Sequence, residues 1–482
     1  MSAVQAPPAA QITPARHPAS LNLMLWLVAI GFFMQTLDTT IVNTALPSMA
    51  RSLGESPLRM QSVVISYALT MATLTPASGW FADRFGTRTV FVWAVVLFSA
   101  GSIACAMSTS LSMLVFARVV QGIGGANLLP VGRLAVLRIV PRERYLQAMS
   151  LIAIPGMIGP LIGPTLGGWL VQQTSWHWIF LINVPVGVLG CACTWLFMPN
   201  ARTQVSAFDL KGFLLLAVGM IAISLSLDGL AELGLRHATV LVLLILSLAC
   251  LCAYGLHATR RPHPLFSLDL FKIHTYSVGL LGNLFARIGS GAMPYLLPLL
   301  LQVSLGFKPM EAGMTMLPVA AAGMLIKRPV TPLINRLGYQ RVLVINTLLV
   351  GLGIASFALF SLSVPFPVRL VQLALFGAVN SIQFTAMNAL TLKDLGSEHA
   401  SSGNSLFSMI QMLAMSLGVT VAGALLATYG GFFGGGEAVH AKAAFQATFV
   451  SIGIITAASA WIFAQVEPRV RAGAKSADPG EV

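Results

Sequence analysis

Residues 37–47, Leu-Asp-Thr-Thr-Ile-Val-Asn-Thr-Ala-Leu-Pro, place one carboxylate, that of Asp38, inside a largely apolar run that begins at residue 22. An apolar run of about 20 residues is long enough to cross a bilayer as a helix. An ionised Asp is costly in hydrocarbon, and an intramembrane acid therefore indicates a functional site. The stretch thus predicts both a membrane span and a carboxylate that needs a partner.

The rest of the chain repeats this apolar pattern. Charged residues are 9% of the 482 and hydrophobic residues 56%, whereas a soluble chain carries roughly 25% charged residues. The runs do not alternate apolar and polar residues as barrel strands do, so we predict an all-α integral membrane protein. Fourteen spans are expected, at residues 22–45, 61–81, 89–108, 112–132, 148–170, 177–198, 211–229, 239–257, 275–301, 312–332, 341–363, 367–390, 403–428 and 444–466.

Lys and Arg set the expected orientation. With a cytoplasmic N-terminus, the inner segments hold nineteen of the 28 basic residues and the outer segments six, while Arg118, Arg133 and Arg287 fall within spans. Because basic residues concentrate in cytoplasmic loops, both termini are expected in the cytoplasm. Such loops lie beside anionic lipid, so the net charge of +13 requires no nucleic-acid partner. Residues 1–20 show no cleavable signal pattern, and the first span is expected to act as its own insertion signal.

The cysteines and histidines predict no metal site. All five cysteines fall within spans, and the pairs 191/193 and 250/252 are two residues apart. Residues two apart on a helix point in different directions, so the two thiols of neither pair are expected to bind one metal ion. The eight histidines show no zinc spacing. We therefore expect neither a metal nor an organic cofactor.

Two turns of the sequence resemble each other. Gly79–Arg88 contains Asp-Arg-Phe-Gly at 83–86, and Asn-Arg-Leu-Gly follows at 335–338, an offset of 252 residues that includes eight spans. A six-span half repeated once, with two spans inserted between the copies, explains this offset, and repeated halves are typical of transporters. The predicted division is a tail at 1–21, a half at 22–198, an insert at 199–272, a half at 273–466 and a tail at 467–482.

Four motifs in this order resemble the major facilitator superfamily, specifically its fourteen-span drug:proton antiporters of the EmrB/QacA-like type and, within them, the MdtD-type multidrug exporters. They lie at residues 37–43, 79–88, 118–125 and 156–168. The resemblance implies two pseudo-symmetric six-helix halves plus two inserted helices. It also implies an antiporter of the bacterial inner membrane that exports small organic molecules by alternating access, driven by the proton gradient.

Asp38 and Arg118 are expected to meet. At about 1.5 Å per residue they lie roughly 13 and 9 Å from the outer ends of their spans, and two buried charges at matched depth would pair. A change in their separation would change the proton affinity of Asp38, and the resemblance implicates both residues in proton coupling. A static ion pair that fixes helix register is the alternative.

The loop motif is expected to lie at the cytoplasmic gate. Gly79 would allow close helix approach, and Asp83 would either accept from a helix N-terminus across the half interface or pair with a nearby Arg. The resemblance implies a conformational latch formed by Gly79, Asp83, Arg84, Gly86 and Arg88. The second copy carries Asn335 in place of the acid, which predicts a weaker latch.

The span-five motif combines a small-residue face with prolines that favour a kink. We expect a tight contact with the opposite half that restricts leak. Its members are Gly156, Gly159, Pro160, Gly163, Pro164, Gly167 and Gly168.

Polar residues at helical spacing within spans are the candidates for a substrate cavity. For Arg133, cavity lining and snorkelling to the surface both stay open, and for the C-terminal set cavity lining and helix bridging do. Arg287, a full charge near mid-span, is the best candidate for substrate contact. The set comprises Gln35, Thr39, Gln121, Arg133, Asn283, Arg287, Asn380, Gln383, Asn404 and Gln411.

The charge balance bears on the cargo. Three intramembrane arginines against one aspartate disfavour divalent cationic drugs and permit an anionic metabolite or its metal chelate, such as a citrate-like carboxylate. A receptor or an intramembrane enzyme is a distant alternative, because the chain shows no sizeable soluble segment and no nucleophile–base constellation in its spans. The expected partners are lipid, protons and a small-molecule substrate; a monomer is expected, and a periplasmic adaptor stays open.

Overall fold

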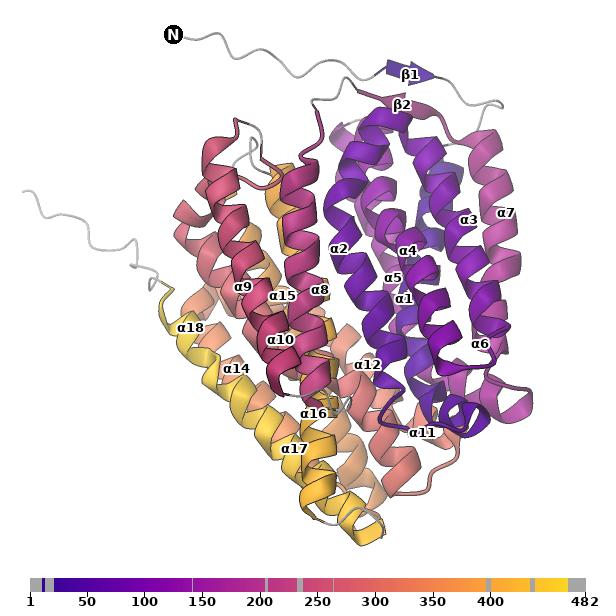
Figure 1. The fold of residues 1–482 in the computed structure, drawn as a ribbon, viewed down its shortest axis with the longest axis vertical. Helices are drawn as coiled ribbons and strands as arrows, with labels where there is room; N and C mark the ends of the chain where they lie inside the picture. Colours follow the sequence, from indigo (N-terminus) through magenta and orange to yellow (C-terminus); the bar gives the residue numbers. More distant parts are fainter. Residues whose placement is uncertain are drawn as a thin grey trace, which may run out of the picture.

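The computed structural model describes residues 11–13, 21–140, 142–203, 207–231, 237–262, 264–395, 400–433 and 438–466. Its helices run roughly side by side along the long axis of the molecule (Figure 1). The predicted all-α membrane fold is confirmed, with one small sheet added. Strand β1 (Gln11–Thr13) pairs antiparallel with β2 (Asn200–Arg202), and Ile12 lies opposite Ala201.

The N-terminal half packs around α1. Helix α1 contacts α4, α5 and α7, while α4 also packs on α2 and α3. Its elements are α1 (Leu21–Leu53), α2 (Gln61–Phe85), α3 (Thr87–Ala106), α4 (Leu111–Ile139), α5 (Arg142–Gln173), α6 (Trp178–Leu181) and α7 (Asn183–Phe197).

The C-terminal half packs in a similar way around α10, which contacts α14, α15, α16 and α17. Its elements are η1 (Leu268–Lys272), α10 (His274–Leu299), the π-turn η2 (Leu300–Ser304), α11 (Pro309–Thr315), α12 (Leu317–Leu325), α13 (Lys327–Leu337), α14 (Tyr339–Ser356), η3 (Phe357–Leu359), α15 (Phe366–Leu392), α16 (Ala400–Phe432), α17 (Ala438–Ala458) and α18 (Ala460–Ala464).

The inserted helices form a hairpin beside the bundle. Helix α8 (Leu210–Ala231) packs on α2 and α16, and α9 (His237–Arg260) packs on α8. Only 22% of the most apolar stretch of α9 is buried inside the molecule. This hairpin therefore lies at the periphery, away from the centre of either half.

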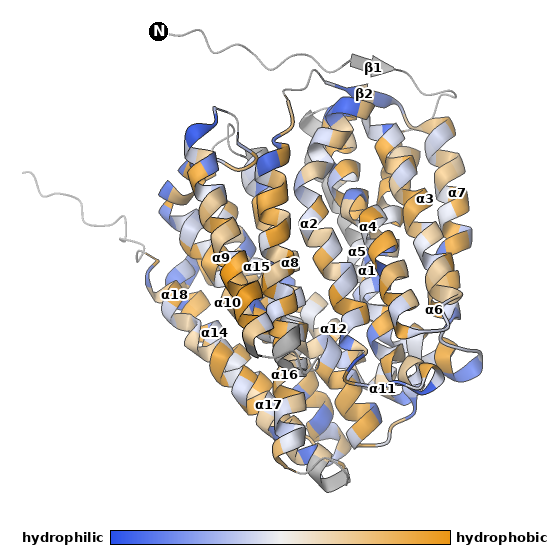
Figure 2. Cartoon of the chain, viewed as in Figure 1, coloured by the Kyte–Doolittle hydropathy of each residue, from blue (hydrophilic) through white to orange (hydrophobic). Residues whose placement is uncertain are grey.

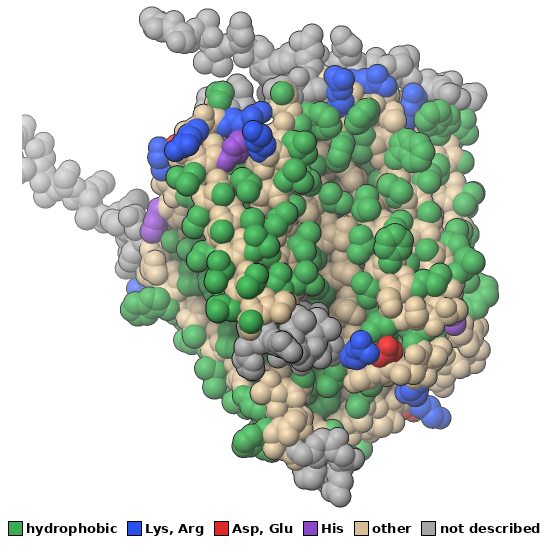
Figure 3. Space-filling model, in the orientation of Figure 1, with side chains coloured by type: hydrophobic (Ala, Val, Ile, Leu, Met, Phe, Trp, Pro, Cys, Tyr) green, Lys and Arg blue, Asp and Glu red, His purple; other side chains and the backbone are tan. Residues whose placement is uncertain are grey.

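The described residues contain eleven helices long and apolar enough to cross a membrane, or twelve if the bent pair Pro309–Leu325 and Pro329–Leu337 forms one span. Helices α2 and α5 are not among them, although both run alongside the others (Figure 1). The number fourteen thus stays a prediction. Apolar residues colour most helices in Figure 2, and Figure 3 shows apolar side chains over the middle of the surface, as a lipid-facing surface requires.

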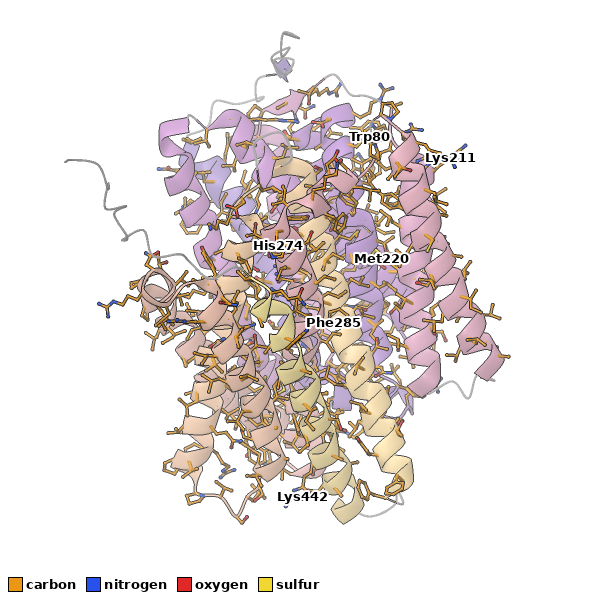
Figure 4. All side chains as sticks on the ribbon, turned by 90° about the vertical axis from the view of Figure 1, so that its left-hand side faces the viewer. Trp80, Lys211, Met220, His274, Phe285 and Lys442 are labelled. Carbon is orange, nitrogen blue, oxygen red and sulfur yellow. The ribbon has the colours of Figure 1, made fainter. Side chains whose placement is uncertain are left out.

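The two ends of the bundle differ in charge. We call the end that carries β2, Arg84, Arg88 and Arg138 the basic end, and the end where α1 gives way to α2 the far end. Lys and Arg gather along the basic end in Figure 3, and Figure 4 places Trp80 and Lys211 there and Lys442 at the opposite end.

The repeated turns have the same backbone geometry. Gly86, between α2 and α3, has φ 94° and ψ 147°, and Gly338, between α13 and α14, has φ 80° and ψ 160°. An L-residue rarely adopts such a positive φ. At Gly86 an added Cβ would also lie only 2.1 Å from Oδ1 of Asn200. Both copies of the motif therefore require glycine for one sharp helix–helix turn.

Candidate proton and substrate site

Asp38 and Arg118 form an ion pair in the middle of the N-terminal half. Nη1 of Arg118 lies 2.6 Å from Oδ2 of Asp38, and the two side chains are 1% and 0% exposed. The prediction from the sequence that Asp38 of α1 and Arg118 of α4 lie at the same depth and meet is thus confirmed. A buried pair of this kind is strongly coupled, because loss of either partner leaves an uncompensated charge.

Three further side chains complete a buried network around this pair. Gln121 donates through Nε2 to Oδ1 of Asp38 (2.8 Å) and to Oγ of Ser102 (2.9 Å), and its Oε1 accepts from Nη1 of Arg118 (2.5 Å). Asn183, the first residue of α7, donates to Oδ1 of Asp38 at 3.4 Å. The carboxylate of Asp38 therefore accepts from three donors, each on a different side chain.

The network revises the role expected for Gln121 and adds residues that the sequence analysis missed. Gln121 was predicted to line a cavity, but it is fully buried between Asp38, Arg118 and Ser102. Asn183 could have been suspected as an amide inside an apolar span. Ser102 carried no such signal, because a serine readily satisfies its own helix, here by donating to the carbonyl of Phe98.

Aromatic rings enclose the guanidinium of Arg118. Its Cζ lies 4.1 Å from the ring centroid of Tyr67 on α2 and 5.8 Å from that of Phe180 on α6. Nε of Arg118 donates to the carbonyl of Val63 at 3.2 Å. A cation over an aromatic face is stabilised most when it is desolvated, so Tyr67 adds to the polar contacts that hold Arg118 in place.

The other N-terminal cavity candidates differ in exposure. Gln35 is buried and its Nε2 lies 4.0 Å from Sδ of Met71. Thr39 is half-buried and donates to the carbonyl of Thr36 at 2.8 Å. Arg133 is exposed. Both interpretations of Arg133 therefore remain open, since a wet cavity and the membrane surface each leave it accessible.

Arg287 is a buried arginine on α10 of the C-terminal half, but its described partners are neutral. Its Nη2 donates to Oδ1 of Asn283 (3.1 Å) and Asn388 (3.4 Å), and its Cζ lies 4.4 Å from the ring centroid of Phe384. The side chain is 5% exposed, and among the described residues it has no acidic partner and its Nε has no acceptor. Among the described residues, this half thus holds a buried cation without a counter-charge.

Most of the remaining C-terminal candidates bridge helices. Asn380 accepts from Ser290 of α10 (2.6 Å), and Gln411 of α16 donates to Asn388 of α15 (2.9 Å). Gln383 joins α15 to α14, since it donates to Thr347 (2.6 Å) and accepts from Asn346 (2.8 Å). For the half-buried Asn404 the described contact is through its backbone carbonyl, which accepts from Ser408.

The loop motif forms its contacts inside the N-terminal half. Asp83 forms an ion pair with Arg138 at the end of α4, so the nearby-Arg alternative holds, and Thr203 donates to the same carboxylate at 2.6 Å. Arg88 donates to the carbonyl of Met198 at 3.4 Å, and Arg84 is exposed. The sequence analysis had not placed Arg138 or Thr203 in this motif.

Gly79 does not have the role expected for it. A Cβ added there would meet no described atom within 4 Å. The expectation of close helix approach at this position was therefore wrong.

The glycine face of α5 packs mainly within its own half, which corrects the expected contact. Added Cβ atoms at Gly156, Gly159, Gly163 and Gly167 would lie between 2.0 and 2.7 Å from atoms of α1. Helix α5 continues through Pro160 and Pro164. The small-residue spacing predicted a close contact correctly but could not identify the partner helix.

Among the described residues, the far end of α5 reaches the opposite half. A Cβ at Gly168 would lie 2.2 Å from the carbonyl oxygen of Pro309, and a Cβ at Gly313 would lie 2.2 Å from that of Pro164. Thr165 also donates to the carbonyl of Gly313 at 3.3 Å. Helices α5 and α11 therefore cross with each backbone pressed against a glycine of the other.

Side-chain hydrogen bonds between described residues join the two halves at the far end. They include Thr165 to Gly313, Tyr295 to the carbonyl of Leu58 (3.4 Å) and Gln302 to the carbonyl of Thr44 (2.8 Å). The two halves are thus held together at the far end. Contact between the halves at one end is one of the two arrangements that alternating access requires.

These features define the class of the protein. Residues 28–419 match the Major Facilitator Superfamily, and the chain belongs to that family.

Its relatives narrow the group. The chain is 51% identical to a protein of Pectobacterium atrosepticum named "Putative multidrug resistance protein MdtD" over 452 residues, 94% of this chain and 97% of the relative. It is 52% identical to the protein of the same name from Serratia proteamaculans, with 94% of each chain covered. The crystal structure of a D-xylose–proton symporter has the same fold, with a TM-score of 0.65 at 14% identity over 93% of this chain and 98% of the other. The protein is thus a membrane transporter of this superfamily and not an enzyme, and its relatives at 51–52% identity are named as multidrug resistance proteins.

Proposed function

We propose that this protein is a proton-coupled antiporter that exports small organic molecules across the bacterial inner membrane, with Asp38 as the proton carrier. The buried Asp38–Arg118 ion pair supports this proposal above all. Drug exporters of this family draw on the proton gradient and use no cofactor. A membrane-embedded acid that loses its arginine partner when it takes up a proton is the simplest way to couple transport to that gradient.

The proposed cycle follows from the contacts of Asp38. In the described arrangement the carboxylate keeps three donors, from Arg118, Gln121 and Asn183. If α1 moves relative to α4 and α7, these donors are lost together, and a proton from outside replaces them. The neutral acid then allows the bundle to return, and the proton leaves to the cytoplasm when Arg118 pairs with Asp38 again.

We propose that the basic end faces the cytoplasm, with both termini there. Lys and Arg gather at that end (Figure 3), as the cytoplasmic loops of membrane proteins do. The Asp83–Arg138–Thr203 contacts would then form the cytoplasmic latch, and the α5–α11 crossing would seal the periplasmic side. The division into two halves, an insert and two tails belongs to the same proposal, in which the transporter works as a monomer, with or without a periplasmic adaptor.

A second candidate cargo is an anionic metabolite or its chelate with a metal, such as a citrate-like carboxylate. Arg287 favours it, because this buried guanidinium has only neutral hydrogen-bond partners among the described residues. A carboxylate is the natural partner of a desolvated guanidinium. The proton carrier and its mechanism are the same for either cargo.

Transport by purified protein in liposomes with an imposed pH gradient tests the proposal. Three probes separate the cargo classes: ethidium as a cation, norfloxacin as a zwitterion and citrate as an anion. We expect Asp38→Asn to lower proton-driven exchange of the transported probe at least about 100-fold, and Asp269→Asn to leave it unchanged. Asp269 is the control because its carboxylate is exposed and pairs with Lys272 at the surface, far from the buried pair of Asp38 and Arg118. Undiminished exchange in Asp38→Asn would refute the proposal.

A further inference from the structure

Two buried polar atoms beside the ion pair have no hydrogen-bond partner. They are Oη of Tyr67 and Oε1 of Gln35, on side chains that are 2% and 4% exposed, and neither atom has a partner among the described residues. Buried polar groups in native proteins are nearly always satisfied. Two unsatisfied acceptors in one place therefore indicate a site for a hydrogen-bond donor.

The two atoms belong to one cluster. Nε2 of Gln35 contacts Sδ of Met71, and a Cβ added to Gly125 would lie 2.8 Å from Oη of Tyr67 and 3.3 Å from the same sulfur. Gly125 of α4 thus leaves room for the hydroxyl end of Tyr67. The sulfur of Met71 lies between this hydroxyl and Gln35 of α1. Helices α1, α2 and α4 meet at this point.

The cluster lies between the basic end and the ion pair. Helix α1 starts at the basic end, so Gln35 lies nearer to that end than Asp38 by about 4.5 Å at 1.5 Å per residue. Gly125 follows Arg118 by seven residues on a helix that ends at the latch, which places it on the same side. A substrate that enters from the basic end would therefore meet Gln35 and the Tyr67 hydroxyl before it reached the network of Asp38.

Tyr67 connects this cluster directly to the proton site. Its ring centroid lies 4.1 Å from Cζ of Arg118, while its hydroxyl projects toward Gly125 and Met71. The groups that titrate or carry charge around it are Asp38 on α1, Arg118 on α4 and Cys105 on α3. A ligand bound to the hydroxyl would thus restrain the ring that holds the guanidinium.

We propose that Tyr67 couples substrate binding to the proton carrier. Its hydroxyl and the amide oxygen of Gln35 accept hydrogen bonds from an N–H or O–H group of the substrate, and its ring positions Arg118 against Asp38. This inference rests on the proposed antiport function and adds to it a contact residue and the donor chemistry that a substrate must carry.

The hydroxyl and the ring can be tested separately in the same liposomes with ethidium, norfloxacin and citrate. Tyr67→Phe removes only the hydroxyl, so the KM of the transported probe should rise about tenfold, the effect of one lost hydrogen bond, with kcat and the proton leak without probe unchanged. Gln35→Leu should raise KM similarly. Tyr67→Leu also removes the ring, and we expect a lower kcat and a proton leak in the absence of probe.

Tyr276→Phe is the matched control. Tyr276 is equally buried in the C-terminal half, but its hydroxyl already donates to the carbonyl of Gly403 at 2.8 Å. This variant should leave KM and the leak unchanged even if it lowers stability.

Two results would overturn the inference on Tyr67 alone: wild-type KM in Tyr67→Phe while Asp38→Asn is inactive, or the same leak in the Phe and Leu variants. A wild-type protein that exchanges none of the three probes for protons would instead overturn the proposed function, and the inference with it.

Discussion

The two halves of the bundle share a plan but treat their buried arginines differently. In the N-terminal half, Arg118 pairs with Asp38, and the buried charges cancel. In the C-terminal half, Arg287 occupies an equally buried position with Asn283 and Asn388 as partners and no acid among the described residues. The buried arginine of the N-terminal half is thus neutralised by an acid, whereas Arg287 has only neutral partners among the described residues.

The difference suggests a division of labour. A self-neutral pair can take up a proton only if its two members separate, so its protonation reports a conformational change. An uncompensated cation needs no such change to attract a ligand of opposite charge. The N-terminal half is therefore suited to proton coupling and the C-terminal half to contact with cargo. Each prediction below would break or sharpen this contrast.

The stability of the two arginine sites gives the largest expected difference. Arg118→Met leaves Asp38 buried without its partner and should destabilise the protein by about 3–5 kcal/mol, whereas Arg287→Met removes an unpaired buried charge and should be neutral or stabilising. Thermal unfolding in detergent measures both. The double variant Asp38→Asn/Arg118→Met should recover most of the loss. Equal destabilisation by the two single variants would show that Arg287 has a counter-charge after all.

The junction between the halves gives the next largest effect. Gly168→Leu would place a side chain against the carbonyl of Pro309, where even a Cβ would lie at 2.2 Å, and should hinder closure at the far end. Overpacking of about 1–3 kcal/mol corresponds to exchange in liposomes slower by roughly fivefold to 150-fold. Gly79→Leu is the matched control, because a Cβ there meets no described atom within 4 Å. Equal rates for both variants would mean that the α5–α11 crossing does not limit transport.

The sequence was informative wherever the geometry of one helix decides the result. Depth along a helix follows from a fixed rise per residue, and for this reason the meeting of Asp38 with Arg118 could be predicted. The shared turn of the two halves could be predicted as well, because its glycine is needed for a local backbone conformation that Gly86 and Gly338 both adopt.

Contacts that depend on the rotation or partner of a helix could not be predicted in this way. The spacing of Gly159 and Gly163 indicates a close-packed face but does not say that the face meets α1. Asn183 and Ser102 join the network only because α7 and α3 turn those residues toward α4 and α1. The β1–β2 pairing links residues 11–13 to residues 200–202. No local sequence pattern predicts a contact between residues so far apart in the chain.

A comparison of two buried aspartates gives the smallest expected effect. Asp209, outside the membrane spans, precedes α8 and accepts from Nε2 of His257 (2.8 Å) and from the backbone N–H groups of Gly212 and Leu265. Burial by itself raises the pKa of Asp209, but these hydrogen bonds outweigh it and hold the pKa below its ordinary value of 3.8. The carboxylate thus ties the start of the insert to its end, and its described contacts do not include the proton site.

Asp209→Asn should therefore lower stability without changing transport. Hydrogen bonds to a charged group contribute about 1.5–3 kcal/mol each when buried, and a substituted amide keeps part of them, so we expect a loss of about 1–2 kcal/mol at pH 7. Because the pKa in the folded state is depressed, this contribution is present above the unfolded-state pKa and disappears as the pH falls through the lower folded-state value. Thermal unfolding of both proteins from pH 7 to pH 3 should show the difference shrinking only below about pH 4, with proton-driven exchange at pH 7 the same in both. A loss of exchange in Asp209→Asn comparable to that in Asp38→Asn would place the insert in the transport pathway and end the contrast between a mechanistic and a structural aspartate.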